Sequence, residues 1–334
     1  MHGIDYKEGS VRRSNMKRAA VASVFCLFAA GIATAQTEMV PFGDFEHWTV
    51  RYVNESGIIG GQTKCLYAIG ETDTIRRNIP FRYEGVYAEG HNPWSVSNAY
   101  AKVSGIEKGS GTTTPERRGN GVCCRMDAKL EEVVVFGFID IKVLVNGTIF
   151  TGKTIEPIRS AKDPYSNIDF GVPFTRRPKA LIVDYKAIIS DEETVTYAKG
   201  FGKPKQIKGH DEAEMYVLLQ KRWEDGNGNI HALRVGTAAY RVTKTQSTWV
   251  NDFEVPVHYG DISGQPYFKE YMGLTKPYRA LNSRGKIVPI MEDGWGSEQD
   301  QPTHIIIVLT SGCHEAFVGH AGNSFWVDNV RLKF

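Results

Sequence analysis

The stretch GTIFTGKTIEP, Gly147 to Pro157, decides between two folds for this chain. Its first part matches the phosphate-binding pattern G-x-x-x-x-G-K-[ST], which leads directly into a helix in nucleotide-binding α/β proteins. Here Thr154 and Ile155 follow the lysine, and Pro157 comes soon after. Two β-branched residues and a proline disfavour a helix start. The sequence therefore predicts no nucleotide site, and we interpret GTIFTGKT as a turn after a long β-strand, VVVFGFIDIKVLV (residues 133–145).

The segment after this stretch also argues against a parallel α/β sheet. ALIVD (residues 180–184) looks like the apolar strand that ends in a magnesium-binding aspartate. A crossover helix would have to fit between residues 154 and 179, and that interval contains four prolines, Pro157, Pro164, Pro173 and Pro178. Prolines inside a helix break it, so ALIVD is predicted to be a strand of an antiparallel structure.

The rest of the chain favours an all-β fold. Short apolar or alternating runs, rich in β-branched and aromatic residues, are separated by Gly, Pro, Asn and Asp, which is typical of a sandwich or barrel. DGNGNI (residues 225–230) predicts a hairpin turn, and GSGTTTPERRGNG (residues 109–121) is the best loop candidate. Besides residues 133–145, the predicted strands are ALIVDYKAII (180–189), EMYVLLQ (214–220), HALRVGTAAYRV (231–242), FEVPVHY (253–259), HIIIVL (304–309) and SFWVDNVRLKF (324–334).

The first 35 residues resemble an export signal. Lys17 and Arg18 precede a short apolar run, AAVASVFCLFAAGIA (residues 19–33), and ATA (residues 33–35) fits a cleavage site. We interpret residues 1–35 as a signal peptide with an upstream extension, and residues 36–334 as a single domain that is exported: periplasmic, at the cell surface or secreted. A retained membrane anchor is the alternative.

Charge and cysteine content limit the functions of the remaining chain. The formal net charge is +2, and residues 1–35 carry more basic than acidic side chains, so the remainder is close to neutral. The sequence contains no basic stripe with interleaved aromatic residues, so nucleic acid is not expected as a partner. The four cysteines that remain allow three full disulfide connectivities or four free thiols; they are Cys65, Cys123, Cys124 and Cys313. Alternation along a strand lets at most one of Cys123 and Cys124 face a given core.

Several stretches together resemble one family, the putative carbohydrate metabolism domain of glycan-using Gram-negative anaerobes. The resemblance implies a jelly-roll β-sandwich, similar to carbohydrate-binding modules and to the sandwich domains of glycoside hydrolases. It also implies export and partners among outer-membrane glycan-import components, but it identifies no catalytic residues. The stretches are NPW (92–94), NGTIFTGK (146–153), FGVPFTRRPKALIVDYKA (170–187), HDEAEMYVLLQ (210–220), WVNDFEVPVHY (249–259) and residues 304–334.

The leading functional hypothesis is non-catalytic glycan binding by aromatic stacking. Its candidate residues are Trp94, Trp223, Trp249 and Trp295, which stand beside polar, Gly- or Pro-bearing stretches, although core packing is the alternative for each. Trp326 shares strand alternation with Val330, Leu332 and Phe334 and is predicted to be core. The first rival is a glycoside hydrolase with two convergent carboxyl groups. The second is a structural or adhesive surface protein.

A structural calcium ion is the leading metal hypothesis, and no cofactor for catalysis is expected. PFGDFEHW (41–48) and FWVDNVRL (325–332) resemble the two ends of many jelly-roll carbohydrate modules, in which the terminal strands pair and carboxylates hold calcium. By position the ligands would be Asp44, Glu46 and Asp328, and the alternative is a strand-end carboxylate paired with a cation. His314 and His320, beside Cys313, show no recognisable metal-ligand spacing.

Overall fold

The computed structural model describes residue 2 and residues 36–135, 139–160, 163, 165–274 and 277–334. Residues 35–334 form one compact unit, and the predicted signal peptide lies outside the described residues except for His2. The fold is all-β, as predicted. Its short 3₁₀ helices are η1 (Gly57–Ile59) and η2 (Glu270–Met272). Within the described ranges, no helix is long and apolar enough to cross a membrane.

One main layer is a six-stranded antiparallel sheet. Its order is β21-β15-β27-β9-β8, and β1 also pairs with β27, so the first strand of the unit pairs with the last. The strands are β1 (Thr37–Met39), β8 (Thr113–Arg118), β9 (Gly121–Asp127), β15 (Ala180–Ile188), β21 (Gln246–Pro256) and β27 (Ser324–Lys333).

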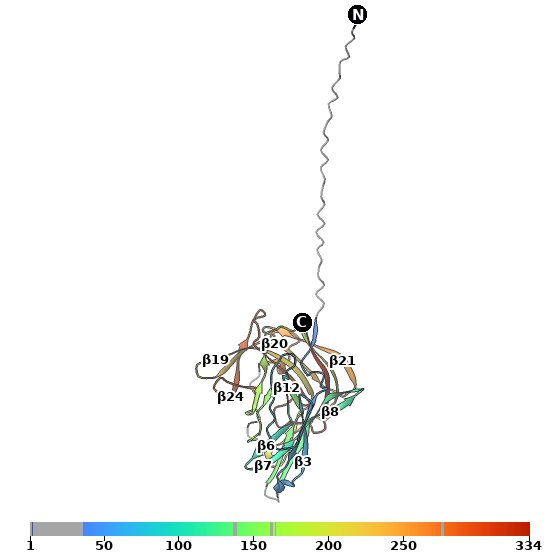
Figure 1. Cartoon of the computed structure of the whole chain (residues 1–334), viewed down its shortest axis with the longest axis vertical. Helices are drawn as coiled ribbons and strands as arrows, with labels where there is room; N and C mark the ends of the chain where they lie inside the picture. The colour runs from blue at the N-terminus through green and yellow to red at the C-terminus, as the bar shows by residue number, and fades with distance from the viewer. Residues whose placement is uncertain (1, 3–35, 136–138, 161–162, 164, 275–276) are drawn as a thin grey trace. The chain divides into compact units, whose positions relative to one another are not determined.

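The other main layer is a ten-stranded sheet with the order β13-β12-β25-β19-β20-β24-β23, to which β5, β14 and β22 add short pairings. Its long hairpin consists of β19 (Ala213–Glu224) and β20 (Ile230–Val242). Strand β24 (Ile287–Trp295) pairs with β20 on the other side, and the three strands lie together in Figure 1. The other strands are β5 (Trp94–Val96), β12 (Thr148–Thr154), β13 (Ile168–Phe170), β14 (Val172–Pro173), β22 (His258–Tyr259), β23 (Arg279–Leu281) and β25 (His304–Thr310).

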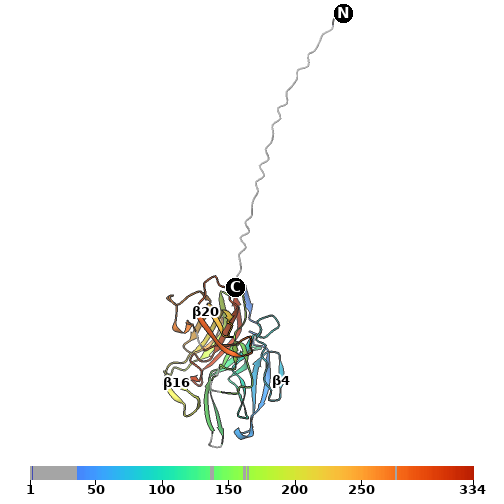
Figure 2. The same ribbon diagram turned by 90° about the vertical axis from the view of Figure 1, so that its left-hand side faces the viewer.

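Four smaller sheets flank these layers. Figure 2 shows β4 and β16 on opposite sides of the unit. The small sheets are β3-β2-β4, β6-β7, β10-β11-β17 and β18-β16-β26. Their strands are β2 (Trp48–Asn54), β3 (Thr63–Ile69), β4 (Asp73–Ile75), β6 (Ala99–Val103), β7 (Ile106–Ser110), β10 (Lys129–Val135), β11 (Ile139–Val145), β16 (Thr194–Tyr197), β17 (Lys199–Phe201), β18 (Lys205–Lys208) and β26 (Val318–Gly319).

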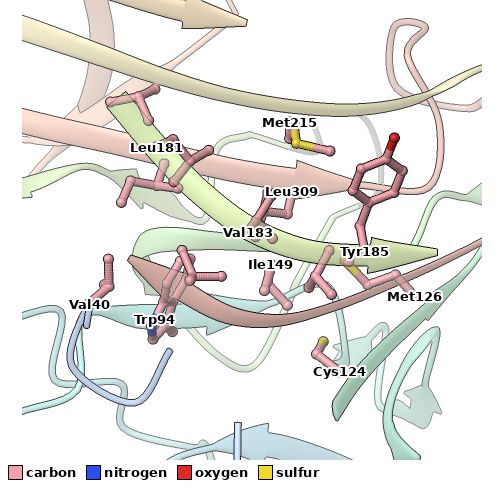
Figure 3. Close-up of a cluster of buried hydrophobic side chains, with 14 of the residues drawn as sticks. Val40, Trp94, Cys124, Met126, Ile149, Leu181, Val183, Tyr185, Met215 and Leu309 are labelled. Atoms are coloured by element: carbon pink, nitrogen blue, oxygen red, sulfur yellow. The ribbon is translucent and has the colours of Figure 1, made fainter. Parts of the chain in front are cut away.

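The main hydrophobic core lies between the two large sheets. Leu181, Val183 and Tyr185 project from β15 toward Met215 of β19 and Leu309 of β25 (Figure 3). Along β15 and β25 the predicted alternation therefore places one side of each strand in this core. The chain passes repeatedly from one sheet to the other, for example from β15 to β19 and from β20 to β21. This arrangement is the β-sandwich that the sequence predicted.

The opening stretch forms a strand and not a turn. No helix begins at Lys153, so the rejection of a phosphate loop is confirmed, but Thr148–Thr154 is β12, which pairs with β5, β13 and β25. Ile149 enters the main core, whereas Phe150 packs on the other side of the sheet with Phe170. The interpretation as a turn was wrong because β-branched and aromatic side chains here have partners on both faces of a sheet.

Two further expectations about local structure are corrected. Residues 133–145 are not one long strand, because β10 and β11 pair antiparallel, Val135 opposite Ile139. The residues between them, 136–138, lie outside the described residues. The predicted loop at residues 109–121 contains β8, at the edge of the six-stranded sheet, where Pro115 is tolerated.

Two bulges flank β15 at Asp184. Both neighbouring strands contain an extra residue there, and Asp252 in β21 and Asn329 in β27 have left-handed φ angles of 54° and 51°. The bulge at Asn329 shifts the alternation of β27, so Phe325 and Val327 enter the core together with Val330. Trp326 therefore points to the opposite face, where Lys186 and Arg125 cover its ring. The prediction that Trp326 is buried is confirmed, since it is 5% exposed, but the predicted shared face with Val330 and Leu332 is wrong because the bulge shifts the alternation.

The four cysteines of the unit are free. Cys124 lies in the main core, whereas Cys123, on the opposite face of β9, donates to the carbonyl oxygen of Glu116 at 3.3 Å. The expectation from alternation is therefore confirmed for this pair. Burial raises the pKa of both thiols, so they are inert, protonated groups at neutral pH.

Candidate carbohydrate-binding site

The exposed end of the β19–β20 hairpin presents a tryptophan stacked on a histidine. Trp223 and His231 are direct cross-strand partners, with ring centroids 5.5 Å apart and ring planes at 12°. Trp223 is 44% exposed. The turn between β19 and β20 is the one that DGNGNI predicted. Asp225 stabilises it by accepting hydrogen bonds from the backbone N–H groups of Asn227 and Asn229. The result is a flat aromatic ring, supported from one side and open to solvent.

Carboxylates surround the histidine of this stack. His231 Nδ1 lies 2.7 Å from Asp293 Oδ2, and His231 Nε2 lies 3.7 Å from Asp225 Oδ2. The hydrogen bond with Asp293 raises the pKa of His231. The hydrogen bonds from Asn229 lower the pKa of Asp225 to about 2, so this carboxylate is ionised at neutral pH. Trp223 therefore stands beside fixed polar groups suited to sugar hydroxyls, which is the usual composition of a sugar site.

Trp295 lies on the opposite face of the same sheet. It pairs with Arg234, and the guanidinium carbon of Arg234 is 5.8 Å from the centroid of the Trp295 ring. Arg234 is fully buried and donates to Glu292, which also accepts from Gln220 at 2.6 Å. Trp295 is half-buried over this ionic network, so it shares no surface with Trp223.

Trp94 is not a surface residue. It is 0% exposed in the main core (Figure 3), its indole Nε1 donates to the carbonyl oxygen of Pro41 at 2.9 Å, and its ring packs edge-on against Phe45. The sugar-binding prediction for Trp94 was wrong, because its strand, β5, pairs with β12 and turns the indole inward. The alternative that the sequence left open, core packing, describes this residue.

Trp249 belongs to a charged cluster on the outer face of the six-stranded sheet. The guanidinium carbon of Arg118 lies 3.9 Å from the centroid of its ring, and Lys186 Nζ lies 5.6 Å from it. Arg118 Nη1 donates to Asp184 at 3.0 Å and to Asp328 at 2.6 Å. Asp184 and Asp328 are direct cross-strand partners and are almost fully buried. The indole of Trp249 is thus a cover for an ionic cluster.

The predicted calcium ligands do not meet. Asp328 has Arg118 as its cation, Glu46 accepts from the backbone N–H of Val122 at 3.2 Å, and Asp44 lies half-buried in the turn after β1. In the part of the chain that the structure describes, these carboxylates do not form a three-ligand cluster. The predicted set of calcium ligands is therefore corrected. The cation at Asp328 is the guanidinium of Arg118, which agrees with the alternative of a strand-end carboxylate paired with a cation. Calcium binding stays a prediction.

Sequence reasoning missed Arg118 and the hub role of Asp184. Asp184 Oδ1 accepts from the backbone N–H of Asp252 and from Arg331, and its Oδ2 accepts from Arg118 and Asn329. The only sequence signal was a carboxylate inside an apolar strand, ALIVDYKAI, where an unpaired charge would be costly. Arg118 gave no signal, because its strand resembled a loop.

Fold and site together define a β-sandwich protein that exposes a tryptophan stacked on a histidine at the end of the β19–β20 hairpin. The sequence matches the family described as putative carbohydrate metabolism domain over residues 73–333, and the chain belongs to this family. No curated protein matches it.

Solved structures of two proteins are similar to this chain. One is described as a putative glycoside hydrolase from Bacteroides vulgatus, with a TM-score of 0.41, 14% identity and coverage of 89% of this chain and 94% of the other. The second, described in the same words, is from Bacteroides thetaiotaomicron, with a TM-score of 0.42, 17% identity and coverage of 90% and 79%. Both are too distant to assign a function to this chain.

Proposed function

We propose that this protein binds carbohydrate without cleaving it and that Trp223 is the platform on which a sugar ring stacks. The observation that carries the proposal is the 44% exposed indole fixed parallel to His231 at 5.5 Å. The apolar face of a pyranose matches an aromatic ring in size, and hydroxyl groups at its edge need donors and acceptors. Asp293 of β24, which contacts His231, and Lys221, two residues before Trp223 on β19, supply these groups. The family membership supports a carbohydrate ligand.

Hydrolysis is the rival function, because two carboxylates, Asp184 and Asp328, differ in their pKa. Hydrogen bonds from Asp252, Asn329 and Arg118 overcome the effect of burial and lower the pKa of Asp184, whereas burial raises the pKa of Asp328. Opposite shifts of this kind mark acid–base pairs in glycosidases. Against this role, Arg118 occupies the space between the two carboxylates, and both are at most 6% exposed.

A second carboxylate pair is too widely separated for hydrolysis. Glu214 and Glu292 point to the same face of the ten-stranded sheet. Glu292 pairs with Ala232 of β20, which pairs with Arg222 of β19, and Arg222 is eight residues from Glu214 along β19. At about 3.3 Å per residue, this spacing is roughly 26 Å. Glycosidases need about 5–10 Å between their carboxyl groups. Glu214 and Glu292 therefore cannot serve as the two carboxyl groups of a glycosidase.

We also propose that the protein acts after export, since residues 1–35 resemble a signal peptide. Components of glycan import at the outer membrane would be its partners there. Fractionation of cells that express the full chain tests this part: the processed protein is expected outside the cytoplasm, and an unprocessed cytoplasmic protein would contradict the proposal.

A glycan array followed by calorimetry on the best ligand tests the binding proposal. Trp223→Ala is expected to weaken binding by about tenfold or more, the loss of one aromatic contact of roughly 1–2 kcal/mol. Tyr267→Ala is the matched control, because Tyr267 is 41% exposed and also stacks on a histidine, His258, at 4.0 Å. Binding that depends on Tyr267 and not on Trp223 would refute the assigned platform.

The same samples test the absence of cleavage. Incubation with the bound glycan is expected to release no reducing ends. Release that Asp184→Asn or Asp328→Asn abolishes would replace the binding proposal with hydrolysis at the six-stranded sheet.

A further inference from the structure

Three side chains with metal-binding atoms meet where two neighbouring strands begin and end. Asp211 precedes β19, and Cys313 and His314 follow β25; the two strands pair antiparallel, so these ends lie together. One carboxylate oxygen, the Cys313 Sγ and one ring nitrogen of His314 all lie within 4.8 Å of one another. The sequence showed no metal-ligand spacing here, because Asp211 is about a hundred residues from the other two.

The carboxylate of this cluster is held rigidly. Asp211 Oδ1 accepts from the backbone N–H groups of Glu212 and Cys313 at 3.1 and 3.0 Å. Its Oδ2 accepts from the backbone N–H of His320 at 2.8 Å and from Asn323 at 3.3 Å. The partners are all donors, and the Asp211 side chain is fully buried, so the cluster contains a fixed anion.

The other two ligands have room to turn toward this anion. His314 Nε2 lies 4.0 Å from Asp211 Oδ1 and 2.9 Å from the carbonyl oxygen of His210. Cys313 and His314 are only partly buried. His320, whose backbone N–H donates to Asp211, has its ring Nε2 3.3 Å from Glu192 Oε2 and its Nδ1 buried without a hydrogen-bond partner among the described residues. A buried imidazole nitrogen without a hydrogen-bond partner is unusual, and it belongs to a residue whose backbone helps to hold the Asp211 carboxylate.

We propose that Asp211, Cys313 and His314 bind a divalent transition metal ion of the zinc class. Sulfur, imidazole nitrogen and carboxylate oxygen are the three donor types of zinc sites, at about 2.0–2.3 Å from the ion. A tetrahedral ion with such bonds separates its ligand atoms by about 3–4 Å. The observed cluster is therefore slightly expanded, and a small rotation of His314 away from His210 closes it. Water would take the fourth position, because Cys313 and His314 are only partly buried.

Metal binding at this site releases a proton. Burial raises the pKa of the Cys313 thiol to about 12, so without an ion the thiol is protonated at neutral pH. On binding, the S–H bond breaks, the sulfur keeps the electron pair and bonds to the ion, and the proton passes to buffer. The bound ion would tie the segment before β19 to the segment after β25.

Cobalt(II) titration of the purified, chelator-stripped protein tests the site. One equivalent is expected to produce the visible bands of tetrahedral cobalt(II) and a near-ultraviolet thiolate-to-metal band, and added Zn²⁺ is expected to remove both. Cys313→Ser is expected to eliminate the thiolate band, and His314→Ala to weaken binding by more than about tenfold. His314→Ala also serves as the second variant if Cys313→Ser fails to fold.

Cys65→Ser is the matched control, because Cys65 is the exposed one among the four cysteines that the structure describes. It is expected to leave the spectrum unchanged, as is Trp223→Ala, which separates this proposal from glycan binding. The absence of a thiolate band, its persistence in Cys313→Ser or its dependence on Cys65 would each overturn the proposal.

Discussion

Asp184 and Asp328 face each other across neighbouring strands, β15 and β27, and a single nitrogen of Arg118 donates to both. Two like charges in direct cross-strand register repel each other unless a cation separates them. The bulges at Asp252 and Asn329 bring further donors to Asp184 from both sides. Arg118, from an edge strand, is therefore the cation that the two aspartates share, while Arg331 also donates to Asp184.

Removal of that arginine is expected to destabilise the fold. Arg118→Ala leaves two nearly buried carboxylates without their shared cation, and we expect a loss of about 2–3 kcal/mol in the free energy of unfolding. Urea denaturation measures it. Arg117→Ala is the control on the same strand, because Arg117 is exposed, and it should change the free energy by less than about 0.5 kcal/mol. Equal effects of the two variants would contradict the cluster.

The two aspartates are expected to respond to pH in opposite directions. The folded-state pKa of Asp184 is lowered, so its contribution to stability is present above the ordinary value of 3.8 and is lost as pH falls through the folded pKa. The folded-state pKa of Asp328 is raised, so its ionisation costs stability as pH rises through that pKa.

Stability measured from neutral to acidic pH separates these effects. The advantage of the wild-type protein over Asp184→Asn should shrink as pH falls. Relative to Asp328→Asn, the wild-type protein should instead gain stability over the same acidic range. Parallel curves for the two variants would show that the two carboxylates do not differ in this way.

Glu156, in the opening stretch, is expected to be a stability residue. Its two carboxylate oxygens accept from Arg51 and from the backbone N–H groups of Phe81 and Tyr100, and both charged side chains are buried. Glu156→Gln removes the charge and points an amide group at donors, which we expect to cost about 3–5 kcal/mol. Thermal and urea unfolding measure the loss. Glu89→Gln, at an exposed position, should be neutral.

Trp94 and Trp223 are expected to behave oppositely in stability and binding. Trp94→Ala opens a cavity in the main core and should cost about 3–5 kcal/mol of unfolding free energy. Trp223→Ala should cost less than about 1 kcal/mol, because this ring is largely in solvent. Denaturation of both variants, compared with their glycan affinities, checks the assignment. A folded, stable Trp94→Ala protein that has lost binding would restore Trp94 to the sugar site.

Local patterns explain which elements could be predicted. In ALIVDYKAII and HIIIVL, strand-forming side chains and flanking turn residues act within a few positions of each other, and both are strands. DGNGNI makes its turn through Asp225 and its own neighbours. Pro157 and the β-branched residues before it excluded a helix at Lys153 for equally local reasons.

Other features depend on partners far along the chain. The bulge at Asn329 turns Trp326 to the face opposite the main core, and Asn329 donates there to Asp184 of β15, 145 residues away in sequence. β8 resembled a loop because glycines flank it on both sides and it contains Pro115, and its pairing with β9 makes it a strand. The tryptophans looked alike in sequence, yet pairing of β5 with β12 buries Trp94, whereas Trp223 stays exposed.

The sequence by itself determined the all-β class, the family, the hairpin at Asp225 and the absence of a phosphate loop, because these rest on side-chain alternation and on turn chemistry within a few residues. The tertiary structure alone decided which tryptophan reaches solvent, which cation meets Asp328 and which carboxylate joins Cys313 and His314. Those outcomes depend on strand register, and register is set by core packing and by bulges between segments up to about two hundred residues apart.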